Sequence, residues 1–529
     1  MLARNCFSLA IGIGCAALVA GAALAAPPQA EDSYFQAGRK QVRERLAVAP
    51  STARAKNVIL FVGDGMGVNT LTAARIFQGQ LLGTDGESYV TAMDALPWAG
   101  LSRTYSHDAQ VSDSAPTATA LLSGVKTRND VIGVDQSVPV DACAAMRGHE
   151  TPSLFVQAEA AGLSTGIIST ARITHATPAA AYAHTPDRDW ENDAAVPAEA
   201  AAQGCVDIAR QLIEWPAGDG FEVVLGGGRR QFMTEQQVDP ENPQIKGLRK
   251  DKRDLVAAWR KAHRDGAYVW NKRQFEAVDP ARTTRLFGLF EPDHLQFEGE
   301  REQDKGGEPA LAEMTAKAIR LLSRNDKGFV LLVEAGRIDH AHHGNEARLA
   351  LMDTVALDEA VRAALTLTDP KDTLVIVTAD HSHNLSIVGY PRRGNAILGT
   401  VVGTDGKVVK GADGKAITTL SYANGPGGVD GPRRDPAAEA TEALEYRQPA
   451  LAPSRSASHG GRMCRSGRAA RGRIFWPGRW SSKPSITSWR TRWDWRRSSR
   501  KRRLQGPDAR TKRRPLRERH WRERDSIWG

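Results

Sequence analysis

The stretch NVILFVGDGMG at residues 57–67 indicates the fold class. It is a short apolar run, rich in β-branched residues, that ends in Gly-Asp-Gly. Such a run is typical of a buried parallel strand that delivers an acidic side chain, here Asp64, at its C-terminal end. Apolar runs that end in small or polar residues recur at residues 162–170, 221–228, 327–336 and 372–383.

Helical patterns separate these strands. Apolar residues fall at i, i+3, i+4 and i+7 in residues 152–161, 311–325 and 349–365. Strands that alternate with helices predict an α/β fold around a doubly wound, mostly parallel sheet. In such sheets the chemistry gathers at the C-terminal ends of the strands, so we expect the polar residues that close the runs to face one cleft.

Two segments depart from this alternation. Residues 230–310 are charged and weakly periodic, and we interpret them as an insertion. Residues 398–429 contain Thr-Asp-Gly and Ala-Asp-Gly between β-rich flanks. This pattern predicts hairpins outside the main sheet.

The basic character of the chain belongs to its C-terminal end. The 529 residues carry a formal charge of +10. Residues 462–529 hold 20 Arg and 3 Lys against 5 acidic residues, a net charge of +18, so the other 461 residues carry −8. A polyanion-binding interpretation would therefore apply to this tail alone.

The first residues predict export. Residues 1–25 have one Arg, an apolar core of small residues and an Ala-Leu-Ala cleavage signal, so we expect a signal peptide removed after Ala25 and an exported, periplasmic or extracellular protein. A lipid anchor on Cys15 is the alternative, although the Gly-rich residues before it fit poorly. No later apolar run is long enough to span a membrane.

Cysteine usage agrees with an oxidising compartment. Cys6 and Cys15 lie in the expected signal and Cys464 lies in the basic tail, which leaves Cys143 and Cys205. No C-x-x-C spacing suggests metal or redox chemistry. We therefore predict a disulfide between Cys143 and Cys205.

Ser114 is a candidate nucleophile. In VSDSAPTATALLSGVKT, residues 111–127, it comes just before Pro116 and an Ala/Leu helical run. This order places its hydroxyl at a helix N-terminus, where the dipole favours an anion. The alternative is that Ser114 or Asp113 serves only as the helix N-cap.

Acids and imidazoles follow three of the predicted strands or lie near the tail. Hard carboxylates with imidazoles are zinc ligands, and sites built mainly from oxygen suit magnesium. One Asp-His pair alone is usually a solvated loop, but three clusters that each close a core strand disfavour that reading. The candidates are Asp64; Glu334, Asp339, His340, His342 and His343 in VEAGRIDHAHH; Asp380, His381 and His383 in TADHSH; and His459 in SHGG.

Taken together, these motifs resemble the alkaline phosphatases. The resemblance covers about residues 56–461 and includes DGMG, DSAPTATALLSGVKT, THATPAA, VEAGRIDHAHH, TADHSH and LSYANGPG. It implies a three-layer α/β sandwich around the central sheet. It also implies hydrolysis of phosphate monoesters through a phosphoserine, with two zinc ions and one magnesium ion per chain and a homodimeric assembly.

The resemblance carries over residue by residue. It implies that Ser114 is phosphorylated and that Arg188, in HTPDRDW, binds the phosphate with both arms of its guanidinium. His175 and His340 stand where the family varies, and we expect them to tune metal affinity and pH optimum. The implied ligands are Asp339, His343 and His459 for one zinc, Asp64, Asp380 and His381 for the other, and Asp64, Glu334 and Thr177 for magnesium.

Three other functions stay open at this point. A phosphodiesterase of the same superfamily usually has Thr at the position of Ser114, and a sulfatase needs a C-x-P-x-R motif that this sequence lacks. A polyanion-binding protein would depend on the basic tail and predicts a salt-dependent complex with DNA. An inactive phosphatase-like protein would keep the motifs with an incomplete fold.

We interpret residues 462–529 as the product of a shifted reading frame. The family continues from His-Gly-Gly into an acidic pair, a strand, an Ala-Arg-Gly-Pro-Gly stretch and an apolar helix. Codons can be chosen for residues 462–472 whose adjacent frame reads Asp-Val-Pro-Ile-Trp-Ala-Arg-Gly-Pro-Gly. On this hypothesis a core strand and helix are lost and the tail is disordered.

The alternative is an arm that binds nucleic acid. The tail is rich in Arg and holds 7 of the 12 tryptophans, a composition that attracts phosphates and stacks on bases.

Resequencing the gene across codons 455–529 tests this interpretation. We expect a one-base difference near codon 462, and we expect the corrected gene to yield a soluble, active phosphatase. The chain as printed should aggregate and show weak activity, because an unpaired sheet edge favours association. An unambiguous read in the printed frame, together with soluble and active protein, would contradict the frameshift.

Overall fold

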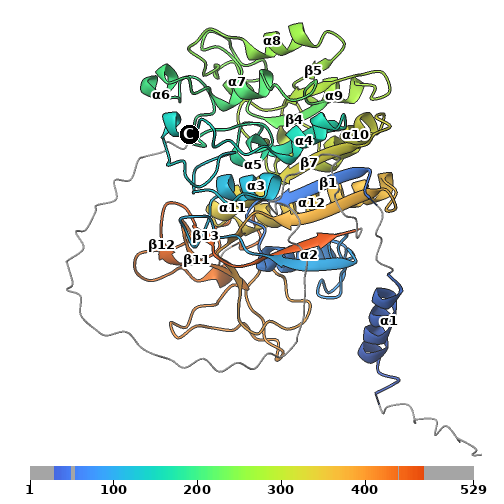
Figure 1. Ribbon diagram of the computed structural model, residues 1–529. Helices are drawn as coiled ribbons and strands as arrows, with labels where there is room; N and C mark the ends of the chain where they lie inside the picture. The colour runs from blue at the N-terminus through green and yellow to red at the C-terminus, as the bar shows by residue number, and fades with distance from the viewer. Residues whose placement is uncertain (1–28, 49–53, 439, 470–529) are drawn as a thin grey trace, which may run out of the picture. The chain divides into compact units, whose positions relative to one another are not determined.

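A nine-stranded sheet forms the centre of the protein (Figure 1). The computed structural model describes residues 29–48, 54–438 and 440–469, so the predicted signal peptide and residues 470–529 lie outside the described residues. In spatial order the strands are β2 (Trp98–Ser102), β14 (Cys464–Arg468), β8 (Thr373–Ala379), β1 (Asn57–Gly63), β7 (Phe329–Ala335), β3 (Ser164–Arg172), β4 (Val223–Gly227), β6 (Leu286–Leu289) and β5 (Ala267–Val269).

The sheet is parallel from β8 to β5, and β14 is antiparallel to both of its neighbours. Alternate residues of each central strand enter different cores: in β1, Ile59 and Phe61 pack into one and Val58 and Leu60 into the other. A sheet buried on both faces needs apolar residues at nearly every position, as NVILFVG has. The predicted three-layer, doubly wound α/β fold is confirmed.

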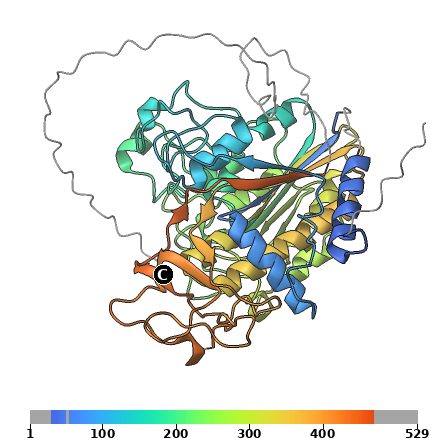
Figure 2. The same cartoon turned by 90° about the horizontal axis from the view of Figure 1, so that it is seen from below.

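Helices cover both faces of the sheet (Figure 2). The yellow and gold helices α10 and α12 pack on one face, while α3, α4, α5, α7 and α8 pack on the other. The helices are α1 (Ser33–Ala47), α2 (Val68–Leu81), α3 (Ser114–Ser123), α4 (Leu154–Ala160), α5 (Ala176–Ala179), α6 (Ala198–Ala202), α7 (Ile208–Ile213), α8 (Leu255–Ala262), α9 (Lys272–Ala277), α10 (Leu311–Leu322), α11 (Arg337–His343) and α12 (Ala347–Leu367).

The register of three central strands positions the site. Gly63 at the end of β1 pairs with Ala335 of β7 and with Ala379 of β8. The three strands therefore end at one level, and the residues that follow them leave the sheet side by side.

Smaller sheets lie outside the central one. β10 (Leu385–Ile387), β11 (Leu420–Gly425) and β12 (Ala450–Pro453) form a three-stranded sheet, and isolated antiparallel bridges such as Val402 with Val408 link residues 400–418. β9 (Ser382–His383) pairs with β13 (His459–Gly460). This last pairing brings His459 next to the residues that follow β8.

Residues 230–310 are not separate from the main sheet. They contribute β6, which pairs with β4, and β5 at the end of the sheet. The interpretation as an insertion missed these strands because they are only 4 and 3 residues long and lie in a charged segment. Such short runs carry almost no periodic signal.

The described residues after Gly461 also join the sheet. β14 pairs along its length with β2 and contacts β8 through Gly467 and Arg468. Cys464 is buried in the core, and Arg465 Nη1 donates a hydrogen bond to the Met93 carbonyl over 3.0 Å. The expectation that a core strand is missing here is therefore wrong for residues 464–468, because backbone hydrogen bonds form a strand even from a polar sequence. The unpaired edge of β8 that led us to expect aggregation and weak activity is filled by β14, so we expect the printed chain to fold and to be active.

Cys143 and Cys205 form the predicted disulfide. It links the 3-10 helix Cys143–Ala145 to the segment after α6, beside buried Trp190. Among the described residues, no helix combines the length and apolar character needed to cross a membrane.

The pairing of β14 predicts different stabilities for two truncated chains. A chain that ends at Gly461 loses this strand and exposes the edge of β8, whereas a chain that ends at Ala469 keeps it. We expect the shorter chain to unfold at a Tm lower by at least about 5 °C in calorimetry. Equal Tm values for the two chains would show that β14 contributes nothing to stability.

Candidate active site

Four buried carboxylates gather at the C-terminal edge of the sheet. Asp64 follows β1, Asp380 follows β8, and Glu334 lies one residue before the end of β7. Asp339 belongs to α11, which begins just after β7. All four are at most 4% exposed, and the level ends of the three strands bring them together.

Burial and mutual repulsion oppose the ionisation of these groups. The pKa of Asp64 is raised well above its ordinary value, first by burial and then by the charge of Asp380. Burial also raises the pKa of Glu334 and of Asp380 to about 7 each. Burial acts in the same direction on Asp339, but His343 and His459 hold its pKa well below the ordinary value. A nearby cation would stabilise the ionised forms of these acids.

Ser114 lies against this acidic group. It is the first residue of α3, and its Oγ lies 3.3 Å from Asp64 Oδ2 and 3.2 Å from His381 Nε2. Asp113 is the N-cap, since its Oδ1 accepts a hydrogen bond from the Ala115 N–H over 2.7 Å. The cap alternative therefore applies to Asp113, and the Ser114 hydroxyl lies at the positive end of the helix dipole.

Arg188 is fixed next to Ser114 through Asp113. Its Nη1 donates to Asp113 Oδ1 over 3.1 Å, and its Nη2 donates to His175 Nε2 over 3.0 Å. The side chain is 16% exposed, so an anion can still reach it. A planar guanidinium held at this position matches the geometry of a phosphate group.

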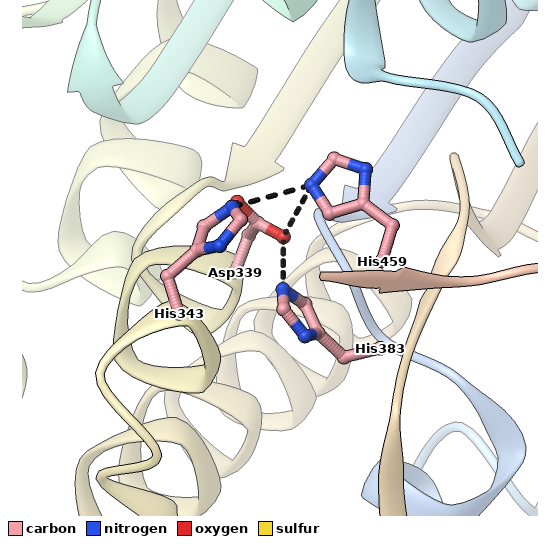
Figure 3. A group of neighbouring side chains, drawn as sticks. All are labelled: Asp339, His343, His383 and His459. Carbon is pink, nitrogen blue, oxygen red and sulfur yellow. Dashed lines mark hydrogen bonds and ion pairs between the residues drawn. The ribbon is translucent and has the colours of Figure 1, made fainter. Parts of the chain in front are cut away.

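Three imidazoles converge on Asp339 (Figure 3). His343 Nε2 lies 3.1 Å from Asp339 Oδ2, and His383 Nε2 lies 3.0 Å from Oδ1. His459 Nε2 lies 3.6 Å from Oδ1 and 3.2 Å from His343 Nε2. Their donor atoms all lie within 4.8 Å of one another, as in a site that could hold one metal ion.

Backbone carbonyls orient two of these rings. His343 Nδ1 faces the Ala457 carbonyl at 2.6 Å, and His459 Nδ1 faces the Ser112 carbonyl at 2.9 Å. With Nδ1–H donating outward, each Nε2 presents its lone pair to the site.

Two further groups share Asp64. Its carboxylate lies within 4.8 Å of donor atoms of Asp339 and His381, and separately of His175 and Glu334. The first group has Asp339 where the predicted zinc set has Asp380, and the second adds His175 to Asp64 and Glu334 of the predicted magnesium set. Asp380 Oδ2 nevertheless lies 3.2 Å from His381 Nε2, and Thr177 lies beside Glu334.

Sequence reasoning left His383 undecided and gave no role to His294. His383 lies in TADHSH two residues after His381, and this spacing was the available signal. Its pairing with His459 across β9 and β13 appears only in the fold. The His294 ring lies 4.2 Å from that of His340 and 5.5 Å from that of His175. It lies in residues 230–310, where no motif marks it. His342 instead bonds to Tyr422 Oη and Thr70 Oγ1.

A hydroxyl at a helix N-terminus, close to buried groups that could hold metal ions and to an arginine, is the arrangement expected of a metal-dependent hydrolase of phosphate esters. The family profile described as "Alkaline phosphatase" matches residues 55–466. The tissue-nonspecific alkaline phosphatase of Rattus norvegicus is 43% identical over 444 residues, 82% of each chain, and that of Gallus gallus is 45% identical over 415 residues, 77% of this chain and 78% of the relative.

A solved structure agrees with these sequence relatives. The alkaline phosphatase of Thermus thermophilus superposes with a TM-score of 0.56 at 26% identity, over 82% of this chain and 90% of that one. The chain belongs to the alkaline phosphatase family. It is therefore an enzyme of phosphate monoester hydrolysis.

Proposed function

We propose that Ser114 attacks the phosphorus of a phosphate monoester and becomes a phosphoserine, which water then hydrolyses. The position of Ser114 Oγ, between Asp64 and His381 at the N-terminus of α3, is the observation that carries this proposal. Family membership supports the overall reaction, and this geometry supports Ser114 as the nucleophile.

We propose that two zinc ions and one magnesium ion bind the site. Carboxylates with imidazoles suit zinc, and an all-oxygen set suits magnesium. The donors fit, because His343 and His459 turn Nε2 inward, and because Thr177 Oγ1 and Glu334 Oε1 are buried without a hydrogen bond to any described residue. The proposed ligands are Asp339, His343 and His459; Asp64, Asp380 and His381; and Asp64, Glu334 and Thr177.

When bound, the ions would lower the pKa of the Ser114 hydroxyl and neutralise the departing ester oxygen. Ser114 Oγ loses its proton and forms its bond to phosphorus as the ester P–O bond breaks. The alkoxide leaves with the electron pair of that bond and takes up a proton to become the alcohol. Water then attacks the phosphoserine, which restores the Ser114 hydroxyl and releases inorganic phosphate.

Arg188 would bind two phosphoryl oxygens through its two arms. Asp113 and His175 each hold one terminal nitrogen, so the guanidinium is oriented before the substrate arrives. These interactions involve the phosphoryl group and not the alcohol. We therefore propose a broad range of monoester substrates.

His175 and His340 support the site from one side. Burial holds the pKa of each imidazole well below its ordinary value, so both rings are neutral. His175 contacts Arg188, and His340 Nδ1 accepts from Arg337 Nη1 over 3.1 Å. We propose that these two histidines tune metal affinity and pH optimum.

We propose that the protein is exported and acts as a homodimer. The disulfide between Cys143 and Cys205 supports an oxidising, periplasmic or extracellular location. The N-terminal signal pattern supports export, and the homodimer rests on family membership.

Replacing the nucleophile tests the proposed function. We expect Ser114→Ala to lower kcat for p-nitrophenyl phosphate by at least about 100-fold, because the covalent intermediate cannot form. EDTA should abolish the turnover of the unmodified chain. Ser123→Ala, the same change at the other end of α3, should retain turnover. A near-normal kcat in the Ser114 variant would refute its role.

Replacing a predicted ligand tests the metal assignment. We expect His459→Ala to lower the zinc content, measured by atomic spectroscopy, by about one ion per chain, since a site with three protein ligands depends on each. His263→Ala, which removes an imidazole next to Trp259, should leave the zinc content unchanged. Unchanged zinc in both variants would exclude His459 as a ligand.

A further inference from the structure

Asp130 has a left-handed backbone conformation and takes no part in the proposed mechanism. Its φ is +67°, in a region that residues other than glycine rarely adopt and that Asp and Asn tolerate best. Its backbone N–H donates to Asp113 Oδ2 over 2.7 Å. Its carbonyl accepts from the backbone N–H of Arg188 over 2.8 Å. One residue thus contacts both the cap of the nucleophile helix and the phosphate-binding arginine.

Asp113 joins these elements through three hydrogen bonds. Its Oδ1 accepts from the Ala115 N–H and from Arg188 Nη1, and its Oδ2 accepts from the Asp130 N–H. The side chain is 15% exposed, so water competes little for these contacts. The orientation of the Asp113 carboxylate therefore determines where the guanidinium lies relative to Ser114.

A single antiparallel bridge lies beside the left-handed residue Asp130. Ile132 and Thr185 form an antiparallel bridge, in which each backbone N–H donates to the other carbonyl over 3.0 and 2.9 Å. The bond from the Arg188 N–H to the Asp130 carbonyl lies close to this bridge along both segments. Changing φ at Asp130 would turn its N–H away from Asp113 or its carbonyl away from Arg188.

We propose that Asp130 is a positioning residue for phosphate binding and acts through its left-handed backbone. It aligns Arg188 with Ser114 by holding the Asp113 carboxylate and the main chain of Arg188 at once. This inference rests on the proposed phosphatase function. The Asp130 carboxylate accepts none of these hydrogen bonds, although its charge acts on Asp113 and Arg188. The proposal concerns the backbone conformation, so the test compares variants that all lack this charge.

The comparison of Asp130→Ala with Asp130→Gly isolates the backbone effect. Both variants lack the carboxylate, but only glycine adopts a positive φ without a steric cost. We expect the inhibition constant of inorganic phosphate to be about tenfold higher for the Ala variant than for the Gly variant, because a small displacement of a binding group weakens binding strongly. Asp130→Asn, which tolerates the left-handed region, should resemble the Gly variant.

Two controls separate positioning from general destabilisation. In an Arg188→Ala background, the ratio between the Ala and Gly variants should fall to about one, because the group being positioned is gone. Lys252 has a φ of +63° in a loop outside the site. Lys252→Ala and Lys252→Gly should differ in Tm but not in phosphate inhibition.

Each outcome decides between the two proposals. If the unmodified chain does not hydrolyse p-nitrophenyl phosphate, the proposed function fails and this inference fails with it. If the unmodified chain is active, three results overturn only the inference: equal inhibition constants for the Ala and Gly variants, weakened binding in the Asn variant, or a ratio that persists without Arg188.

Discussion

The burial of four carboxylates at one edge of a parallel sheet is the constraint on which the active site depends. Asp64, Glu334 and Asp380 lie together because β1, β7 and β8 are neighbours that end at one level. Burial raises the pKa of each of these three groups, so their ionised forms need positive charge nearby. The helix dipole of α3 and the guanidinium of Arg188 lie beside these groups, and the proposed metal ions would supply further positive charge.

The sheet positions the carboxylates, whereas loops position Arg188. The strand ends place the carboxylates through backbone pairing that a single side-chain change cannot shift. Arg188 lies in a loop, and hydrogen bonds to Asp113, His175 and Asp130 hold it. Asp113 joins the two systems, because it caps α3 at Ser114 and also binds Arg188. In the proposed mechanism, the placement of the phosphate therefore depends on these loop contacts as well as on the metal ligands.

The sequence predicts the features that a local pattern encodes. Apolar runs that end in polar residues identify β1, β3, β4, β7 and β8, and they place Asp64, Glu334 and Asp380 at strand ends. The sequence did not predict β5, β6 and β14, because short or polar strands depend on pairing with distant partners. The sequence also gave no indication of His294 or of the left-handed backbone at Asp130, because only the fold brings their neighbours close to them.

The proposed mechanism depends above all on Ser114 as the residue that carries the phosphoryl group. The most direct test is to quench the metal-loaded enzyme with acid during turnover of p-nitrophenyl phosphate and to map the phosphate by mass spectrometry of peptides. Acid traps a phosphoserine that accumulates before hydrolysis. We expect phosphate on the Ser114 side chain, in the peptide that contains this residue. Active enzyme with phosphate on another residue would refute Ser114 as the nucleophile.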